Sequence, residues 1–169
     1  MKMNKSNCEK AEMLVEVLPY VNRFRDKIIV IKYGGNAMIN EELKKAVMQD
    51  LLLMKSVGMH PILVHGGGPA INDMLKKLKV ESHFEQGLRV TDKETMEIVE
   101  MVLAGKVNKD IVGTLNQIGG KGIGLSGKDG NLIQARKKYL EKNGEKIDIG
   151  YVGEVEVVNK EMLESLIYS

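Results

Sequence analysis

The sequence has little of several features that would place a protein in a common class. It contains one cysteine, Cys8, which excludes an internal disulfide and fits a reducing compartment. Tryptophan is absent and aromatic residues make up 4% of the chain, so no stacking surface for nucleic-acid bases is evident. With 25 basic and 23 acidic side chains the net charge is +2, which indicates neither nucleic acid nor an anionic membrane as a partner.

Long hydrophobic runs and metal-ligand patterns are also missing. The longest apolar runs reach four residues, for example 28–31 and 51–54, which is too short for a transmembrane helix or a signal-peptide core. The three histidines lack the spacing of zinc ligands, so we expect no metal site. These absences predict a cytoplasmic protein. The 169 residues, 43% of them hydrophobic, suffice for one domain with a sizeable core.

Two glycine-rich turns each follow an apolar segment that is expected to form a buried strand. Gly34-Gly35 comes after the strand 27–32, which closes with Lys32, and Gly66-Gly67-Gly68 comes after the strand 61–65. Glycine at a strand-to-helix turn lets backbone N–H groups approach a ligand, and the helix N-terminus behind the turn favours anions. On adjacent parallel strands the two turns would form one crevice containing Lys32, which would suit phosphoryl transfer.

Short apolar strands alternate with helical patterns, which predicts the fold class. One helix is expected between the N-cap Asn40 and Gly58, with Leu43 and Leu51 on its apolar face, and another from Pro69. This alternation predicts an α/β protein: a three-layer α/β/α sandwich with a mainly parallel central sheet. We expect that sheet to contain strands at 27–32, 61–65 and 123–127.

The later part of the chain is expected to be more irregular. Thr91 and Glu94 have the spacing of a capping box and predict a helix start, with helical signal resuming over 106–118. Asp129-Gly130 and Asn143-Gly144 predict turns that flank two polar strands, followed by a short C-terminal helix.

An N-terminal helix over 11–24 carries an apolar stripe and precedes the first core strand. Pro19 lies inside it and predicts a kink or a restart. Two interpretations remain open at this point: the helix packs on its own domain, or it binds a partner.

Three side chains near the turns also allow alternative interpretations. Lys32 either contacts a transferring phosphoryl group or lays its stem along the surface with its head in water. His65 is expected to orient the loop through a hydrogen bond rather than to act as a general base. Arg89, in the irregular segment 80–91, is either a surface arginine or a planar fork suited to a carboxylate.

Four motifs occur in an order that resembles the acetylglutamate kinases of the amino acid kinase family. They are KYGGNAM at 32–38, HGGGP at 65–69, GLRVT at 87–91 and GYVG at 150–153. The first two are shared loosely across the family, and the arginine motif together with the full set narrows the resemblance. It extends from Ala11 to the end of the chain.

The resemblance implies a role for each matching residue. Lys32 would stabilise the phosphoryl-transfer transition state, and Arg89 would bind the substrate α-carboxylate. The backbone glycines divide between holding the acyl substrate (Gly67, Gly68) and lining the phosphate path (Gly34, Gly35, Gly66). The reaction implied is the ATP- and Mg2+-dependent phosphorylation of the γ-carboxylate of N-acetyl-L-glutamate to N-acetyl-L-glutamyl 5-phosphate in arginine biosynthesis, with no tightly bound cofactor. A carboxylate is already ionised at neutral pH and needs no catalytic base.

The resemblance also implies a domain organisation. Residues 1–26 would form an N-terminal helix and 27–169 the acetylglutamate-binding domain, while the family's C-terminal nucleotide-binding domain is absent. We therefore expect this chain alone to be inactive. A non-catalytic acetylglutamate-binding fragment, or a kinase acting on carbamate, glutamate or aspartate, are the alternatives.

The extra N-terminal helix resembles that of arginine-inhibited family members, in which such helices interlace between dimers to build a hexamer. The implied partners are acetylglutamate, ATP, arginine as a feedback inhibitor with Tyr20 near it, and further copies of this chain, with no nucleic acid and no membrane.

Overall fold

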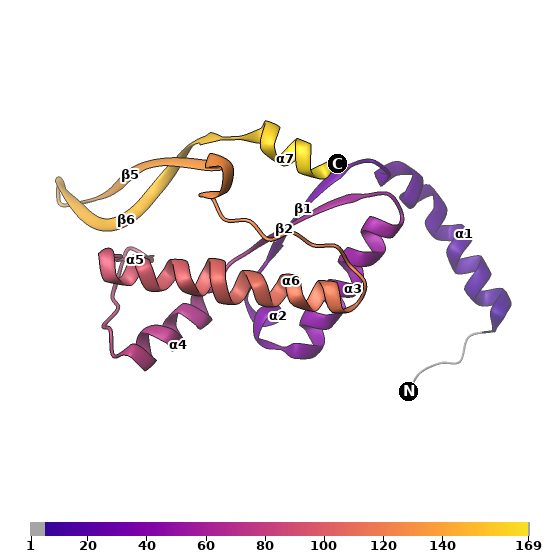
Figure 1. The fold of residues 1–169 in the computed structure, drawn as a ribbon, viewed down its shortest axis with the longest axis horizontal. Coiled ribbons are helices and arrows are strands. Elements are labelled where there is room, and N and C mark those ends of the chain that lie inside the picture. Colours follow the sequence, from indigo (N-terminus) through magenta and orange to yellow (C-terminus); the bar gives the residue numbers. More distant parts are fainter. Residues whose placement is uncertain (1–5, 169) are drawn as a thin grey trace.

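Two parallel strands, with helices packed on one of their faces, form the centre of the molecule (Figure 1). The structure is a computed structural model that describes residues 6–168. The first elements are α1 (Asn7–Phe24), β1 (Ile28–Tyr33), α2 (Asn36–Ile39), α3 (Glu41–Ser56), β2 (His60–His65) and α4 (Gly68–Leu78). A small hairpin follows, formed by β3 (Phe84–Glu85) and β4 (Leu88–Arg89). The remaining elements are α5 (Lys93–Glu100), the π-helical η1 (Met101–Val107), α6 (Asn108–Gln117), the 3-10 turn η2 (Asp129–Asn131), β5 (Ile133–Lys142), β6 (Glu145–Val158) and α7 (Lys160–Ile167).

The pairing of β1 with β2 confirms the predicted α/β fold with a parallel sheet. The strands run in register from Ile28 beside His60 to Tyr33 beside His65. Side chains alternate across a strand, so Ile31 and Tyr33 join a core built from α3, α4, α5, η1 and α6. The opposite face is open within the described residues: Val30 is 66% exposed and Val64 51%.

Helix α3 confirms the sequence signals at both of its ends. The side-chain oxygen of Asn40 accepts hydrogen bonds from the backbone N–H groups of Glu42 (2.9 Å) and Leu43 (3.0 Å). Gly58, with φ of 89°, follows the C-terminus in the left-handed region that glycine favours. The buried face differs slightly from the prediction, because Lys44, Met48 and Leu51 are buried whereas Leu43 is exposed.

Helices α5, η1 and α6 form one continuous rod in place of the two separate helices that the sequence predicted (Figure 1). Its N-cap is Asp92, not Thr91: the Asp92 carboxylate accepts from the Thr95 N–H at 2.8 Å. Thr91 instead pairs in a parallel bridge with Gly150, where its N–H donates to Ile149 and its carbonyl accepts from Tyr151. Gly150 has φ of 79°, and a Cβ there would collide with the Thr91 carbonyl, so this close approach requires glycine.

The strand predicted at 123–127 is wrong, since residues 121–126 form no strand. Side chains of α6 form hydrogen bonds with the backbone N–H and carbonyl groups of this segment instead. The Asn116 oxygen accepts from the Gly122 N–H (2.8 Å), Lys109 donates to the Gly124 carbonyl (3.0 Å) and Asn108 donates to the Leu125 carbonyl (3.3 Å). A strand requires a ladder to a neighbouring strand, and here these helix side chains replace it.

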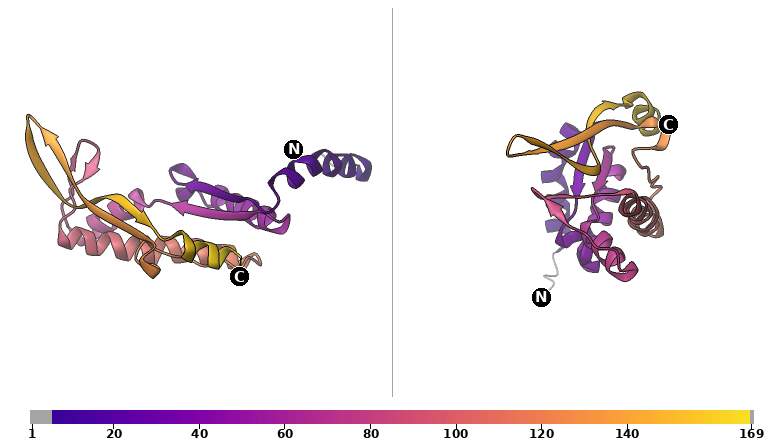
Figure 2. Two further views of the ribbon diagram at one scale, coloured as in Figure 1. Left: turned by 90° about the horizontal axis from the view of Figure 1, so that it is seen from above. Right: turned by 90° about the vertical axis from the view of Figure 1, so that its left-hand side faces the viewer.

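Strands β5 and β6 form the predicted antiparallel hairpin around Asn143-Gly144. The other predicted turn, Asp129-Gly130, lies in the 3-10 turn η2. The hairpin extends away from the parallel strands, and the bridge between Thr91 and Gly150 attaches it to the start of α5 (Figure 2).

Helix α1 confirms the predicted N-terminal helix and begins earlier than expected. A capping box opens it, in which Ser6 Oγ accepts from the Glu9 N–H and Glu9 accepts from the Ser6 N–H. Of the two outcomes predicted at Pro19, a kink or a restart, the restart does not occur, because α1 runs through Pro19 as a single element. None of its residues is buried, and Figure 1 shows it projecting from the body. In the described part of the chain, no helix combines the length and apolar character needed to span a membrane.

Candidate functional site

The carboxyl ends of β1 and β2 lie side by side, and both glycine-rich turns start there (Figure 1). Tyr33, the last residue of β1, pairs with His65, the last residue of β2, and its carbonyl accepts from the Gly66 N–H at 3.2 Å. The structure therefore brings Lys32, Gly34-Gly35 and Gly66-Gly67-Gly68 to one edge of the sheet. Such an edge is where ligands bind in open parallel sheets.

Lys32 is exposed and lies one position before this edge. It pairs with Val64, and alternation along β1 places its side chain on the sheet face opposite the buried Tyr33. The ion pairs of residues 6–168 do not include Lys32. Its ammonium group is thus accessible to an anion at the sheet edge.

The N-terminus of α4 presents backbone donors at the same place. Its N-cap is Gly67, and no side chain that the structure describes caps the first turn. The first N–H groups of a helix have no partner within it, and the helix dipole favours negative charge there. This end of α4 can therefore bind a carboxylate or phosphate oxygen.

The three glycines of the second turn serve different purposes. A Cβ on Gly67 would collide with the Leu103 side chain of η1, so glycine permits close packing there. A Cβ on Gly66 or Gly68 would meet no atom within 4 Å in the part of the chain that the structure describes. Space for the close approach of a ligand is therefore available at these two positions.

A cavity of about 280 Å³ lies beside this turn. It is lined by Tyr33, Met38, Ile39, Lys44, Gly67, Pro69, Ala70, Lys106, Val107, Asp110 and Ile111. Its walls thus come from β1, the helices α2, α3 and α4, and the η1–α6 rod.

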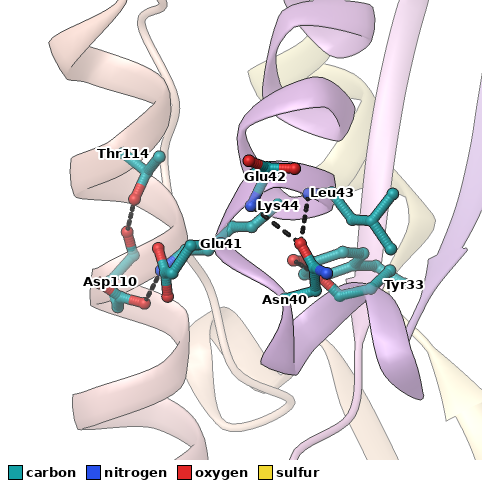
Figure 3. A network of polar contacts seen from close by, with 9 residues as sticks. Tyr33, Asn40, Glu41, Glu42, Leu43, Lys44, Asp110 and Thr114 are labelled. Carbon is teal, nitrogen blue, oxygen red and sulfur yellow. Dashed lines mark hydrogen bonds and ion pairs between the residues drawn. The ribbon is translucent and has the colours of Figure 1, made fainter.

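Lys44 and Asp110, which both line this cavity, form an ion pair that Figure 3 shows from close by. Lys44, only 7% exposed, reaches from α3 to the Asp110 carboxylate on α6, and a Glu41 carboxylate oxygen lies 3.9 Å from its ammonium nitrogen. Burial acts to lower the pKa of Lys44, but the hydrogen bond and charge of Asp110 outweigh it and the pKa is raised overall. For Tyr33 burial has the opposite effect and raises the pKa of the hydroxyl, because it disfavours the charged phenolate. That hydroxyl donates to the Ala37 carbonyl at 2.8 Å.

Arg89 lies on the β3–β4 hairpin, and a hydrogen bond attaches it to α4. Its guanidinium donates to Ser82 and, at 2.5 Å, to the side-chain oxygen of Asn72 on α4, and stacks 4.6 Å from the Phe84 ring centroid. Burial lowers the pKa of this group. Three side chains therefore hold the Arg89 guanidinium in place. One of them, Asn72, belongs to the helix that starts at the glycine turn.

Sequence reasoning missed Lys44, Asp110 and Asn108. Asn108 is 7% exposed and donates both to His65 Nε2 (3.2 Å) and to the Leu125 carbonyl. The available signal was weak: each is a polar residue within a helical pattern, and polar helix residues usually face water. His65 agrees with the prediction that it orients the loop, because its Nδ1 lies 2.9 Å from the Gly66 carbonyl oxygen.

Comparisons with a family profile and with individual proteins point to the same family. Residues 27–169 match the sequence profile of the amino acid kinase family. The chain is 63% identical over 158 residues to an acetylglutamate kinase of Caldicellulosiruptor bescii, covering 94% of this chain and 54% of that protein. It is 58% identical over 169 residues to an acetylglutamate kinase of Moorella thermoacetica, covering 98% and 57%. The chain spans about half the length of the curated relatives it matches.

Solved structures support the same fold. The smu.665 protein of Streptococcus mutans UA159 superposes with a TM-score of 0.70 at 32% identity, covering 83% of this chain and 54% of that one. The N-acetylglutamate synthase of Neisseria gonorrhoeae, complexed with coenzyme A and N-acetyl-glutamate, gives a TM-score of 0.73 at 22% identity, covering 97% and 36%. The second likeness shows the fold alone.

Proposed function

This chain belongs to the amino acid kinase family, and from that premise we propose that it is the substrate-binding half of an acetylglutamate kinase. The observation that carries the proposal is the sheet edge, where the uncapped N-terminus of α4 and the exposed Lys32 lie at the ends of paired parallel strands. Relatives that are 58% and 63% identical and named acetylglutamate kinase support the choice of substrate.

In this proposal the residues supply position and charge. The N–H groups of Gly67 and Gly68 hold the acyl substrate, and Gly34, Gly35 and Gly66 leave room for the phosphate. Lys32 balances the negative charge that spreads over the transferring phosphoryl group. The substrate γ-carboxylate is ionised at neutral pH and attacks without a base, so catalysis consists of orientation and charge neutralisation.

Arg89 would bind the α-carboxylate. Two of its donors are engaged by Ser82 and Asn72, and a guanidinium has five N–H donors, so others are left for a ligand. The described residues hold no group of three or more His, Cys, Asp or Glu side chains able to bind a metal. The proposal therefore assigns Mg2+ to the phosphates of ATP, which is a substrate.

A non-catalytic acetylglutamate-binding fragment is the second candidate. Release of ADP distinguishes the two. We expect the 169-residue chain to release none with acetylglutamate and ATP, and a chain extended by the relatives' second half to release ADP with acetylglutamate. Equal or greater ADP release with carbamate, glutamate or aspartate would contradict the assigned substrate and indicate another amino acid kinase.

A further part of the proposal is a homo-oligomer in the cytoplasm, and the exposed α1 supports the oligomer. Dimers of the full-length form would be joined into a hexamer by α1, because its apolar stripe is exposed in the single chain. Arginine would act on that form as an inhibitor, with Tyr20 near its site.

A further inference from the structure

Asn108 connects three parts of the molecule at the glycine turn. It begins α6, directly after η1, and its side chain is buried. Its Nδ2 lies 3.2 Å from Nε2 of His65, at the end of β2, and 3.3 Å from the carbonyl oxygen of Leu125 in the segment 121–126. Asn108 therefore connects the long helical rod both to the sheet edge, through His65, and to the segment that follows α6, through Leu125.

The chemistry of these contacts fixes which atom of Asn108 donates. The Leu125 carbonyl can only accept, so the amide atom facing it must be the nitrogen. The amide nitrogen has two hydrogens, and the second one points to His65 Nε2, which must then be an acceptor without a proton. A neutral imidazole whose Nε2 has no proton carries its proton on Nδ1.

The other side of the imidazole gives the same answer independently. His65 Nδ1 lies 2.9 Å from the Gly66 carbonyl oxygen, which is also only an acceptor, so Nδ1 must be the nitrogen with the proton. Two contacts on opposite sides of the ring thus require the same tautomer.

The amide of Asn108 has no second satisfactory orientation. Its Oδ1 is buried and, among the described residues, has no hydrogen-bond partner. It lies so close to Gly124 that a Cβ there would collide with it. An orphaned buried oxygen is unfavourable, so the two bonds from Nδ2 determine how this side chain is oriented.

The hydrogen bond to Gly66 also controls the next peptide group. The carbonyl of a trans peptide points opposite to its N–H, so a Gly66 carbonyl held toward His65 directs the Gly67 N–H the other way. The preceding peptide is fixed as well, because the Gly66 N–H donates to Tyr33. The orientation of the Gly66–Gly67 peptide therefore depends on His65.

The structure assigns to Asn108 the role of a positioning residue: it holds His65 in the Nδ1–H tautomer and thereby sets the direction of the Gly67 N–H at the start of α4. The assignment of the ligand that meets this N–H rests on the proposed function, whereas the tautomer does not.

The test of the tautomer is a 15N NMR spectrum of histidine-labelled 169-residue protein at about pH 8.5, above the ordinary histidine pKa of about 6.5. We expect Nδ1 of His65 to be protonated and Nε2 to be bare. Asn108→Asp places an acceptor opposite Nε2, so Nε2 should become protonated in that variant. The control Asn116→Asp lies on the same helix, keeps the acceptor for the Gly122 N–H and should leave His65 unchanged.

A wild-type His65 with the proton on Nε2 would overturn the assignment, and so would an Nε2 that stays bare in folded Asn108→Asp. The wild-type result overturns the assignment in this way whether or not the Asn108→Asp variant folds. Asn108→Ala removes the donor to Nε2 without adding an acceptor, so only the Gly66 contact then favours the Nδ1–H tautomer and the fraction of the Nε2–H tautomer should rise.

The consequence for binding is measured separately by calorimetry. Relative to Asn116→Ala, Asn108→Ala should raise the Kd for acetylglutamate about tenfold, the effect of losing one well-placed hydrogen bond. An unchanged Kd beside a changed tautomer would refute the positioning role. Absence of binding by folded wild-type protein would instead count against the proposed function and leave the tautomer result valid.

Discussion

At the scale of single residues, Lys44 shows how one charge holds two helices around the site. Its ammonium is buried between α3 and α6, and Asp110 is its close partner, while Glu41 is more distant (Figure 3). A buried charge without a partner is strongly unfavourable. Removing Asp110 should therefore cost more stability than the ion pair contributes in comparison with two apolar residues. This contact adds to the core packing of Val107 and Ile111 that holds α6 against α3.

The first prediction concerns Asp110. Asp110→Asn should lower the free energy of unfolding by about 1–3 kcal/mol, because the buried Lys44 ammonium loses its charged acceptor. Urea unfolding monitored by circular dichroism measures it. In the control Asp73→Asn, which breaks an exposed pair with Lys77, the midpoint should barely move. Similar small shifts of the urea midpoint in both variants would mean that the Lys44–Asp110 contact does not stabilise the fold.

The second prediction concerns Arg89. Arg89→Lys keeps the charge but not the planar fork, so acetylglutamate should bind more weakly by about 1.5–3 kcal/mol, the value of a charge-assisted hydrogen bond. Calorimetric titration measures the change. The exposed Arg136, which pairs with Glu154 on the β5–β6 hairpin, provides the control Arg136→Lys. Equal affinities of the Arg89 and Arg136 variants would remove Arg89 from the binding site.

At the scale of elements, features that depend on neighbouring residues were predicted from the sequence more often than features that depend on distant contacts. The cap at Asn40, the glycine turns and the Asn143-Gly144 hairpin depend on neighbouring residues and were predicted. The strand at 123–127 was not confirmed, because a strand depends on a distant partner and α6 takes that place. The shift of the N-cap from Thr91 to Asp92 has a similar origin, namely the bridge from Thr91 to Gly150.

The same distinction divides the candidate site. Its backbone part consists of the two glycine turns, each of which is a short continuous stretch of sequence and was predicted. Its side-chain part joins residues that are far apart: His65 and Asn108 are separated by 43 positions, and Lys44 and Asp110 by 66. Such pairs follow only from the packing of α3 and the η1–α6 rod. The π-helical turns in that rod also have no simple sequence signal.

The third prediction concerns the start of α5 and its dependence on pH. Hydrogen bonding to the Thr95 backbone N–H lowers the pKa of Asp92 below its ordinary value of 3.8. A lowered pKa stabilises the fold above pH 3.8 and loses that effect as the pH falls through the folded-state pKa. Asp92→Asn keeps the capping oxygen but cannot titrate, so its stability should fall less steeply between about pH 5 and pH 2 than that of the wild type.

Urea unfolding at a series of pH values checks this expectation. Asp50→Asn, at an exposed position within α3, is the control and should keep the wild-type slope. The prediction about the cap fails if the Asp92 and Asp50 variants have the same dependence on pH.

At the scale of the whole molecule, much apolar surface is exposed. Helix α1 has no buried residue and Leu14 is 70% exposed, while one face of the parallel sheet exposes Val30 and Val64. Large exposed apolar patches mark interaction surfaces in folded proteins. The described chain therefore presents two faces that further protein can cover, one on the sheet and one on α1.

The fourth prediction concerns α1. In the chain extended by the second half of its relatives, deletion of residues 1–25 should convert hexamers into dimers and abolish inhibition by arginine, because α1 would join the dimers. Sedimentation velocity measures the mass, and Glu12→Gln on the polar side of α1 is the control. If the deletion leaves the mass unchanged and arginine still inhibits, α1 is only a packing element.

The central claim is that the glycine turn at the start of α4 binds acetylglutamate, and calorimetric titration of Gly68→Ala tests it most directly. An added Cβ at Gly68 meets no atom within 4 Å, so the fold is preserved while the methyl group enters the space where a ligand would approach. The control Gly113→Ala also adds a Cβ into open space, on α6. The account predicts saturable binding by the wild type and by Gly113→Ala, and a Kd raised at least about tenfold in Gly68→Ala through the lost backbone contact. Equal affinities in all three proteins, or no binding by the folded wild type, would contradict it.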